Sequence, residues 1–403
     1  MAELTGTQPA RRAGPVPRPL RALLVLLAPL LAGYVVAAIA NPGGSLLPWN
    51  PPMADLDVYL LAGRTLTEGG DIYALDGFPF IYPPIAAVVA AGLALPPLLL
   101  VRLVWTAASV VALVAIVHRA GLRTWRLSMI STAVIIFCTP VSQSLALGQV
   151  SIFLCAWIVL DLMPGPGVLR RRFLPQGWLV GLGAAIKLTP AIFTPHLFLT
   201  GRRRAAVVSV ITFVVVGVLG LVLLPAQSIS FWGGLAGGDT GLGDSIVYYD
   251  NQSIMGSSLR WIGLGTAAKV VGLGLSALVG VLGLVVAVRW HRLGEEALAV
   301  CLVGFTGLLA SPVSWSHHFV WVVPLAIVLW RRRRHLGRAL QVVGWLLVAW
   351  LVLAPYRKLP GGEWIELSYT PAQDLLDTGT VLLGLALLVT AVLRTKDGGR
   401  SGR

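Results

Sequence analysis

The sequence predicts an all-α, polytopic transmembrane protein. Its 403 residues are 56% hydrophobic and only 12% charged, with a mean hydropathy of +0.82, whereas a soluble domain carries about 25% charged residues. Apolar runs that approach the roughly 20 residues of a spanning helix recur throughout, most clearly at residues 22–40, 205–224, 267–288 and 375–393. We count about 12 hydrophobic helices, including short or re-entrant ones.

The chain is expected to form a single membrane domain with two short tails. Residues 1–21 are rich in Pro and Arg, which predicts a disordered cytoplasmic tail. The first apolar run lacks a convincing small-x-small cleavage signal, so we interpret it as a retained span. The transmembrane domain then covers residues 22–394, and residues 395–403 form a second cytoplasmic tail. The three cysteines all lie in apolar runs and suggest neither disulfides nor a metal site.

Charge patterning predicts the orientation. The net charge of +14 comes from short basic clusters between apolar runs, at residues 170–172, 202–204, 289–292 and 331–334. This is the pattern of cytoplasmic loops and does not indicate a nucleic-acid partner. Three long polar stretches, 42–81, 225–265 and 355–374, hold most of the 17 acidic residues. We therefore expect a multi-pass protein of the plasma (inner) membrane whose active site faces the periplasm or cell exterior.

The run at residues 178–199 is apolar but contains Lys187, Pro190 and Pro195. A broken helix at membrane depth is tolerated where it lines a protein or water cavity. An ammonium near that depth costs roughly 2.5 to 3.5 kcal/mol. Snorkelling toward an interface is the alternative, but the break at Pro190 favours a functional Lys187.

The first outer loop carries two carboxylates, Asp55 and Asp57, followed by Tyr59, Arg64 and Tyr82. One carboxylate could accept a proton from a sugar hydroxyl, or the pair could hold a divalent metal. The alternative is a solvated acidic loop without a functional role. We expect a helical or turned segment here, on which side chains two residues apart point in different directions.

A second polar group, at residues 311–318, ends in His317 and His318. Imidazoles at a membrane boundary can bind a phosphate or position a carboxylate. Neighbouring histidines on a helix point about 100° apart, so one of them at most serves a given site. That geometry also argues against a two-histidine metal site.

Amides and aromatic rings supply a third group. Gln149, Asn251 and Gln252, with Arg260 after them, lie in polar segments between apolar runs. Sugars need hydrogen-bond donors and acceptors for their hydroxyls, and their C–H faces stack on rings. Combined with the acids, Lys187 and the histidines, these residues suggest a base, a phosphate clamp and a sugar-binding wall.

Six segments carry a family resemblance, and they lie at residues 55–59, 82–84, 148–149, 187–190, 251–253 and 311–318. As a set and in this order they resemble the hallmark segments of glycosyltransferase family 87. These are actinobacterial mannosyltransferases of the GT-C fold that depend on polyprenyl phosphate mannose. The long Gly-rich stretch at residues 233–243 departs from that pattern.

The resemblance implies an inverting transfer of mannose from polyprenyl phosphate mannose. The acceptor would be a phosphatidylinositol mannoside or lipomannan-type glycolipid, and the new linkage would be α-(1→2). The enzyme would act among membrane lipids, and we expect no cofactor and no metal. It makes Asp55 the catalytic base. Because negative charge gathers on the departing lipid phosphate, we expect Lys187, His318 and Arg260 to bind the donor phosphate. The remaining expected substrate-binding residues are Asp57, Tyr59, Arg64, Tyr82, Gln149, Asn251, Gln252, Trp315 and His317.

Three other functions fit a chain of this composition. A transporter or flippase of a lipid-linked sugar would use Lys187 in a midplane site, but it predicts ionisable groups in several spans and an inverted repeat. Neither pattern is found in the sequence. A related transferase could use another polyprenyl-phosphate pentose or hexose. A non-catalytic scaffold is the third alternative.

Overall fold

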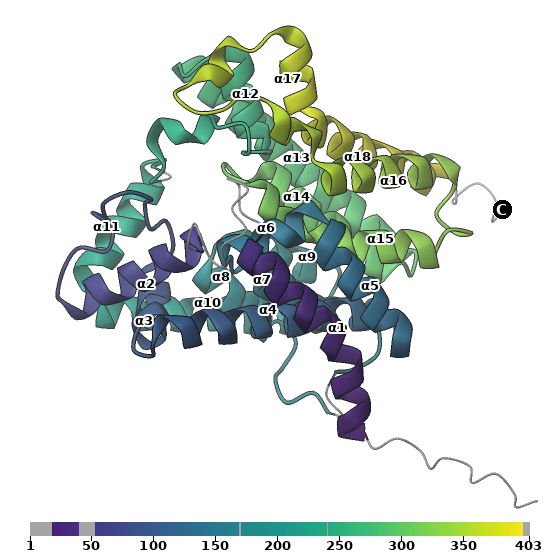
Figure 1. Cartoon of the computed structure of the whole chain (residues 1–403). Helices are drawn as coiled ribbons and strands as arrows, with labels where there is room; N and C mark the ends of the chain where they lie inside the picture. Colours follow the sequence, from purple (N-terminus) through teal and green to yellow (C-terminus); the bar gives the residue numbers. More distant parts are fainter. Residues whose placement is uncertain (1–17, 40–52, 169–170, 240, 398–403) are drawn as a thin grey trace, which may run out of the picture.

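The computed structural model describes residues 18–39, 53–168, 171–239 and 241–397 (Figure 1). These residues form helices and connecting segments without a β-strand, apart from an isolated bridge between Asn251 and Trp315. The predicted all-α class is confirmed. Most of the two expected tails and the first part of the expected outer loop, residues 42–52, lie outside the described residues.

The α-helices follow one another along the chain as α1 (Arg18–Ile39), α2 (Ala54–Thr67), α3 (Pro84–Leu93), α4 (Leu98–Arg119), α5 (Thr124–Phe137), α6 (Thr139–Leu147), α7 (Ser151–Leu162), α8 (Trp178–Ile186), α9 (Phe193–Leu199), α10 (Arg203–Leu223), α11 (Pro225–Ala236), α12 (Ile254–Ile262), α13 (Thr266–Arg292), α14 (Glu296–Ala310), α15 (Val322–Arg331), α16 (Arg338–Leu353), α17 (Pro371–Asp377) and α18 (Gly379–Asp397). Short 3₁₀ helices connect them at η1 (Thr189–Ile192), η2 (Gly243–Val247), η3 (Ser316–Trp321), η4 (Pro355–Lys358) and η5 (Ile365–Ser368).

Within the described part of the chain, four helical segments are long and apolar enough to cross a membrane. They are Leu98–Arg119, Arg203–Leu223, Thr266–Arg292 and Arg338–Lys358. The number rises to six if the pairs α5 with α6 and α17 with α18, bent by 76° and 55°, each count as one span. Shorter apolar helices, such as α7 and α14, accompany them, as the sequence leads us to expect.

The polar stretches expected as outer loops are themselves partly helical. The first contains α2, which buries Leu56, Tyr59 and Leu60. This spacing places the three side chains on one helical face, and that face packs against the membrane domain. The helical or turned conformation expected around Asp55 and Asp57, within the first of these stretches, is therefore confirmed as helical.

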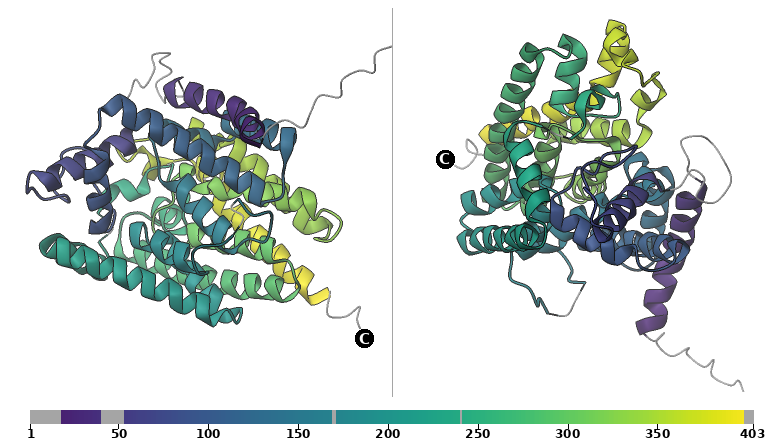
Figure 2. Two further views of the ribbon diagram at one scale, coloured as in Figure 1. Left: turned by 90° about the horizontal axis from the view of Figure 1, so that it is seen from below. Right: turned by 90° about the vertical axis from the view of Figure 1, so that its left-hand side faces the viewer.

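Small residues let the long helices approach closely. A Cβ on Gly181 of α8 would lie 2.3 Å from the carbonyl oxygen of Ser209 on α10, and one on Gly283 of α13 would lie 2.1 Å from Oγ1 of Thr306 on α14. Such contacts are typical of helix pairs in membranes. α1 packs across α4 and α5 on one face of the molecule, and α10 lies on the opposite face (Figure 2).

Basic and cavity-forming segments occupy opposite ends of the helices. The basic end of α10 meets the start of α14 through an ion pair between Arg202 and Glu296, 2.7 Å, and Arg331 at the end of α15 donates to the carbonyl oxygen of Gly121, 2.8 Å. The other ends of α10, α14 and α16 lead into residues 225–265, 311–318 and 355–366. One end of the bundle thus gathers the basic clusters, and the other gathers the polar stretches.

Candidate active site

A cavity of about 630 Å³ lies between α2 and the segments around α12 and α17, which Figure 1 shows at the left and the top of the molecule. Six residues expected from the sequence line it, namely Asp55, Tyr59, Tyr82, Gln149, Trp315 and His317. They come from four separate parts of the chain. Folding therefore gathers six of the thirteen residues that the sequence indicated around one cavity.

Asp55 occupies the first turn of α2 and is partly buried. A carboxylate is favoured there because the N-terminal end of a helix carries a partial positive charge. The side-chain amide of Gln149 donates a hydrogen bond to it. Gly148 makes this contact possible, because it adopts a φ of +69° and its missing Cβ would lie 2.6 Å from the Cβ of Leu56. The Gly148-Gln149 pair is thus explained by a close approach of the turn after α6 to α2.

Burial raises the pKa of Asp55 to about 6, against the opposing effects of the Gln149 hydrogen bond and the positive charge of Lys187. A carboxyl group with this pKa is mostly ionised at neutral pH, yet it is more basic than an ordinary aspartate. Both properties suit a general base.

Tyr59, Tyr82 and Gln149 form a buried hydrogen-bonded cluster beside Asp55. The two phenol oxygens lie 2.8 Å apart, and Tyr59 donates to Oε1 of Gln149 at 3.1 Å. Because that oxygen accepts from Tyr59, the amide nitrogen of Gln149 is directed to the carboxyl group. The cluster fixes the orientation of Asp55.

Lys187 lies where the chain breaks between α8 and η1, and its extended backbone (φ −150°, ψ 127°) turns the side chain inward. Its Nζ lies 2.9 Å from Nε2 of His318 and 3.4 Å from the hydroxyl of Tyr82. It also lies 5.0 Å from the centroid of the Tyr82 ring, a cation–π contact. The helix break expected near Pro190 is confirmed, and it places a cation beside His318.

The two histidines face different surroundings. Nδ1 of His318 accepts from the backbone N–H of Trp315, 3.2 Å, so both of its ring nitrogens have partners. The ring of His317 lies perpendicular to it, with centroids 4.7 Å apart. His317 lines the cavity, and in the described structure neither of its buried ring nitrogens has a hydrogen-bond partner. As expected, the two rings do not serve one position.

Asn251 and Gln252 lie behind the cavity wall and do not line it. Both side chains of Asn251 and Gln252 are fully buried. Asn251 donates to the carbonyl oxygen of Pro312, 3.2 Å, and accepts from the backbone N–H of Ser314, 2.9 Å. Gln252 donates to the carbonyl oxygen of Tyr249, 2.7 Å. The structure does not bring these two amides to the cavity, because they hold one wall segment against another.

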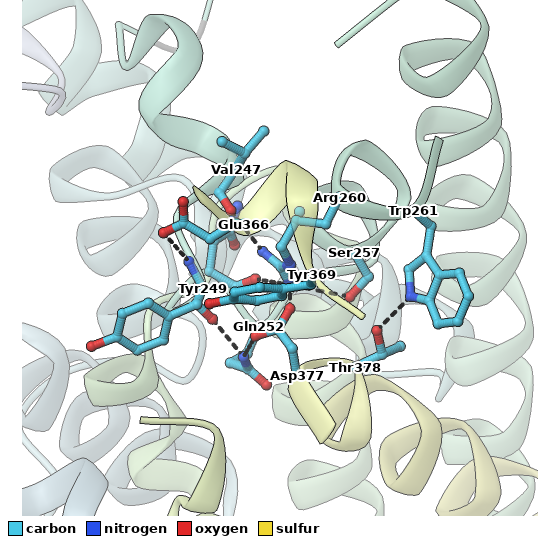
Figure 3. A network of polar contacts seen from close by, with 12 residues as sticks. Val247, Tyr249, Gln252, Ser257, Arg260, Trp261, Glu366, Tyr369, Asp377 and Thr378 are labelled. Atoms are coloured by element: carbon cyan, nitrogen blue, oxygen red, sulfur yellow. Dashed lines mark hydrogen bonds and ion pairs between the residues drawn. The ribbon is translucent and has the colours of Figure 1, made fainter. Parts of the chain in front are cut away.

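Arg260 also departs from the expectation (Figure 3). Its side chain is 0% exposed and forms an ion pair with Asp377, which is 1% exposed. It donates further to the carbonyl oxygens of Tyr248, 3.2 Å, and Asn251, 3.0 Å. The structure does not bring Arg260 to Lys187 and His318, because the buried carboxylate and these carbonyl groups engage its guanidinium.

Asp57 and Arg64 point away from the cavity. Asp57 forms an ion pair with Arg102 on α4, 3.2 Å, and Arg64 is exposed near the end of α2. On this helix Asp55 and Asp57 diverge by about 200°. The two carboxylates therefore do not share one site, and the paired-acid alternative is corrected.

Several lining residues were not singled out as site residues from the sequence, among them Asp250, Arg357, Trp364 and Glu366. Asp250 accepts from Arg357, 3.0 Å, and from Oγ of Ser316, 2.9 Å. Asp250 sits in the polar segment 248–253, which was already a candidate. Arg357 carried no such signal, since its role depends on a partner 107 positions away.

A second cavity, of about 490 Å³, adjoins the first through Tyr59 and Tyr82. Apart from these two hydroxyls and the indoles, its lining is apolar and comes mainly from α3, α4 and α7, with Ile186 next to Lys187. The site therefore combines a polar chamber and an apolar chamber, and Lys187 contacts Tyr82, which lines both.

Comparison with known proteins adds the family. The model of glycosyltransferase family 87 matches residues 80–312. A polyprenol-phosphate-mannose-dependent alpha-(1-2)-phosphatidylinositol mannoside mannosyltransferase of Mycobacterium tuberculosis is 31% identical over 87% of each chain. Its namesake in Mycolicibacterium smegmatis is 29% identical over 84% of this chain and 88% of its own. A phosphatidylinositol pentamannoside mannosyltransferase of the same species is 31% identical over 86% and 84%.

No solved structure matches the chain significantly. The family match covers more than half of the chain, and it includes Tyr82, Gln149, Lys187 and the segment that carries Asp250. The chain therefore belongs to glycosyltransferase family 87 and is a glycosyltransferase.

Proposed function

We propose that this enzyme transfers mannose from polyprenyl phosphate mannose to a phosphatidylinositol mannoside or lipomannan-type acceptor. The transfer inverts the anomeric centre, forms an α-(1→2) linkage and takes place on the extracytoplasmic side. The names of its relatives support the donor and the acceptor class. One observation carries the mechanism: a carboxyl group held by Gln149 lies in the same site as the Lys187–His318 pair.

Asp55 acts as the general base. As the acceptor hydroxyl attacks C1 of the mannosyl group, its proton passes to the Asp55 carboxylate and a new C1–O bond forms. The bond between C1 and the phosphate oxygen breaks, and its electron pair leaves with polyprenyl phosphate. Because attack and departure occur on opposite faces of C1, a β-linked donor gives an α-linked product.

Lys187, which His318 positions through its Nε2, stabilises the charge that gathers on the leaving phosphate. A cation in a partly water-excluded site is well suited to this, and such electrostatic stabilisation is often the largest catalytic contribution. A phosphate already leaves readily, so no general acid is needed. His317 lines the same cavity, and its two ring nitrogens are buried and lack a hydrogen-bond partner in the described structure, so a small shift of its ring would offer them to substrate oxygens.

The adjoining apolar cavity provides the place for the polyprenyl chain. Its lining residue Ile186 directly precedes Lys187, so a lipid seated there would bring its phosphate to the lysine. A sugar on that phosphate would then enter the polar cavity past Tyr59 and Tyr82, which line both chambers.

The proposed side of the membrane rests on the two ends of the bundle. The basic clusters gather at one end and the cavity segments at the other. Since basic ends face the cytoplasm, the cavity opens outside.

Purified protein in lipid, given radiolabelled polyprenyl phosphate mannose and phosphatidylinositol mannosides of different length, tests the proposal. We expect labelled product that is released by an α-(1→2)-specific mannosidase. Transfer only from another polyprenyl-phosphate sugar would contradict the proposed identity of the donor. A product that resists that mannosidase would contradict the proposed α-(1→2) linkage.

A further inference from the structure

We infer that the part of the cavity between Tyr248 and Trp364 binds an uncharged sugar residue of the acceptor next to the one that is glycosylated. This inference rests on the proposed function and assigns the acceptor side of the same cavity. This acceptor subsite is formed by residues 248–250 and 357–366, on segments that join the membrane helices.

Aromatic rings form the first part of this subsite. Trp364 lines the cavity and is 57% exposed, so much of its indole is open to a ligand. Tyr248 lines the same cavity, with its ring 6.3 Å from that of Trp315 in a T-shaped contact. Exposed ring faces of this kind stack on the C–H faces of sugars.

The charges of the lining residues decide between a sugar and a phosphate. Arg357 is the one Lys or Arg among the described lining residues, and Asp250 already pairs with it at 3.0 Å. Glu363 and Glu366 line the same region. The subsite therefore carries an excess of carboxylates. An anionic phosphate would be repelled, whereas sugar hydroxyls would donate to these oxygens.

The backbone that carries Trp364 is strained. Gly362, Glu363 and Trp364 have φ values of +99°, +52° and +64°. For the two residues with side chains this conformation costs roughly 1 to 2 kcal/mol each. Such strain persists where the surrounding structure enforces it, and it clusters at functional sites. Here it turns the indole toward the cavity.

Close packing enforces this conformation. A Cβ on Gly361 would lie 2.2 Å from the ring of Tyr249, so the segment lies directly against that ring. The buried carboxylate of Glu366 accepts from the backbone N–H of Gly362, 2.9 Å, and of Tyr249, 3.4 Å. These contacts join the two segments of the subsite to each other.

The network of Figure 3 anchors both segments to the bundle. Arg260 on α12 pairs with Asp377 on α17, and Gln252 joins Asp377, 3.2 Å, to the carbonyl oxygen of Tyr249, 2.7 Å. Trp261 donates to Thr378, 2.8 Å. The subsite is thus built before substrate arrives, which lowers the entropic cost of binding.

Steady-state kinetics of Trp364→Ala, with acceptor and donor varied in turn, tests the inference. We expect the KM for a phosphatidylinositol mannoside acceptor to rise about tenfold, the size of one lost ring contact, with the donor KM unchanged. Trp364→Phe, which keeps a ring, should recover most of the affinity. Trp125→Ala, which removes a similarly exposed indole from α5 outside the cavity, is the matched control.

An unchanged acceptor KM in Trp364→Ala, or a raised donor KM, would overturn the subsite. Competition with soluble probes adds a second test: methyl α-mannoside should inhibit wild type more strongly than Trp364→Ala, and myo-inositol 1-phosphate should not distinguish them. The reverse result would mean that the region binds a phosphate. A wild-type enzyme with no transfer from polyprenyl phosphate mannose would instead refute the proposed function itself.

Discussion

Nζ of Lys187 lies 2.9 Å from Nε2 of His318, although 131 positions separate the two residues in the chain. The contact depends on two interruptions of regular helix, one after α8 and one at η3. It joins the only lysine that the sequence places deep in an apolar run to a histidine whose other nitrogen is already fixed by Trp315. We expect Lys187, positioned by His318, to hold the donor phosphate.

Lys187→Met should raise the donor KM by about 10- to 100-fold, because a hydrogen bond to a charged group contributes roughly 1.5 to 3 kcal/mol. The acceptor KM should change little. Kinetics with each substrate varied in turn measures both values, and Lys358→Met, at an exposed lysine that does not line the cavity, is the control. An unchanged donor KM would show that Lys187 does not bind the donor phosphate and that its side chain snorkels toward the membrane–water interface.

The pH dependence should report Asp55. Its pKa is raised to about 6, and the base must be ionised, so kcat/KM should fall about tenfold per pH unit below that value and level off above it. Lys187→Met should move the midpoint upward, since the lysine charge lowers the pKa of Asp55. A midpoint that stays in place or moves down in the variant would argue against their proximity.

Arg260→Met should reduce stability and leave the donor KM nearly unchanged. Breaking a buried ion pair costs roughly 3 to 5 kcal/mol, because the remaining charge is left without its partner. The double variant Arg260→Met with Asp377→Leu should recover part of the loss. Arg332→Ala removes a pair with Glu295 whose arginine is 44% exposed, and it should cost at most about 1 kcal/mol.

Thermal unfolding in detergent, compared across these variants, measures the stability. A stable Arg260→Met protein with a sharply raised donor KM would restore the phosphate-binding role first expected for Arg260.

Gly148→Ala should impair catalysis by separating Gln149 from Asp55. The new Cβ would lie 2.6 Å from that of Leu56, in a residue with a φ of +69°. Gly69→Ala has a similar φ of +78° but no atom within 4 Å, so it should bear only a conformational cost of about 1 kcal/mol. Measuring the transfer activity and the thermal unfolding of both variants separates the effect of the clash with Leu56 from that of backbone strain. If both variants lose the same activity, the close approach of Gly148 to α2 is not needed for catalysis.

The sequence indicated a site residue where the residues next to it in the chain carry the signal. Asp55 could be recognised as a candidate base because residues 55–59 resemble a hallmark segment of the family, and the conformation of α2 agrees with its spacing of apolar residues. Lys187 could be recognised because a charge and two prolines interrupt an apolar run. Both signals lie within a few residues of the side chain concerned.

Long-range partners explain what the sequence did not reveal. Arg260 and Gln252 resemble substrate-binding residues until Asp377, more than 100 positions later, engages both. Arg357 and Trp364 lie in a polar stretch without a motif, and their place in the cavity depends on Asp250 and on the packing of Gly361 against Tyr249. No local pattern encodes these contacts.

Orientation can be tested in intact cells with a membrane-impermeant maleimide. The three native cysteines are buried, so introduced cysteines should report cleanly. Asp76→Cys, at an exposed position near the cavity segment, should be labelled from outside, and Arg203→Cys, in a basic cluster, should be labelled only after lysis. The opposite pattern would place the active site in the cytoplasm.

The most direct test of the account compares Asp55→Asn with Asp57→Asn in the transfer assay. The amide keeps the size of the side chain and removes its ability to take a proton, so Asp55→Asn should lower kcat by about 10² to 10⁴ while folding and donor binding persist. Asp57→Asn, which loses only its partner Arg102 on α4, should keep most of the activity. Near wild-type transfer by Asp55→Asn would contradict the central claim that Asp55 is the catalytic base.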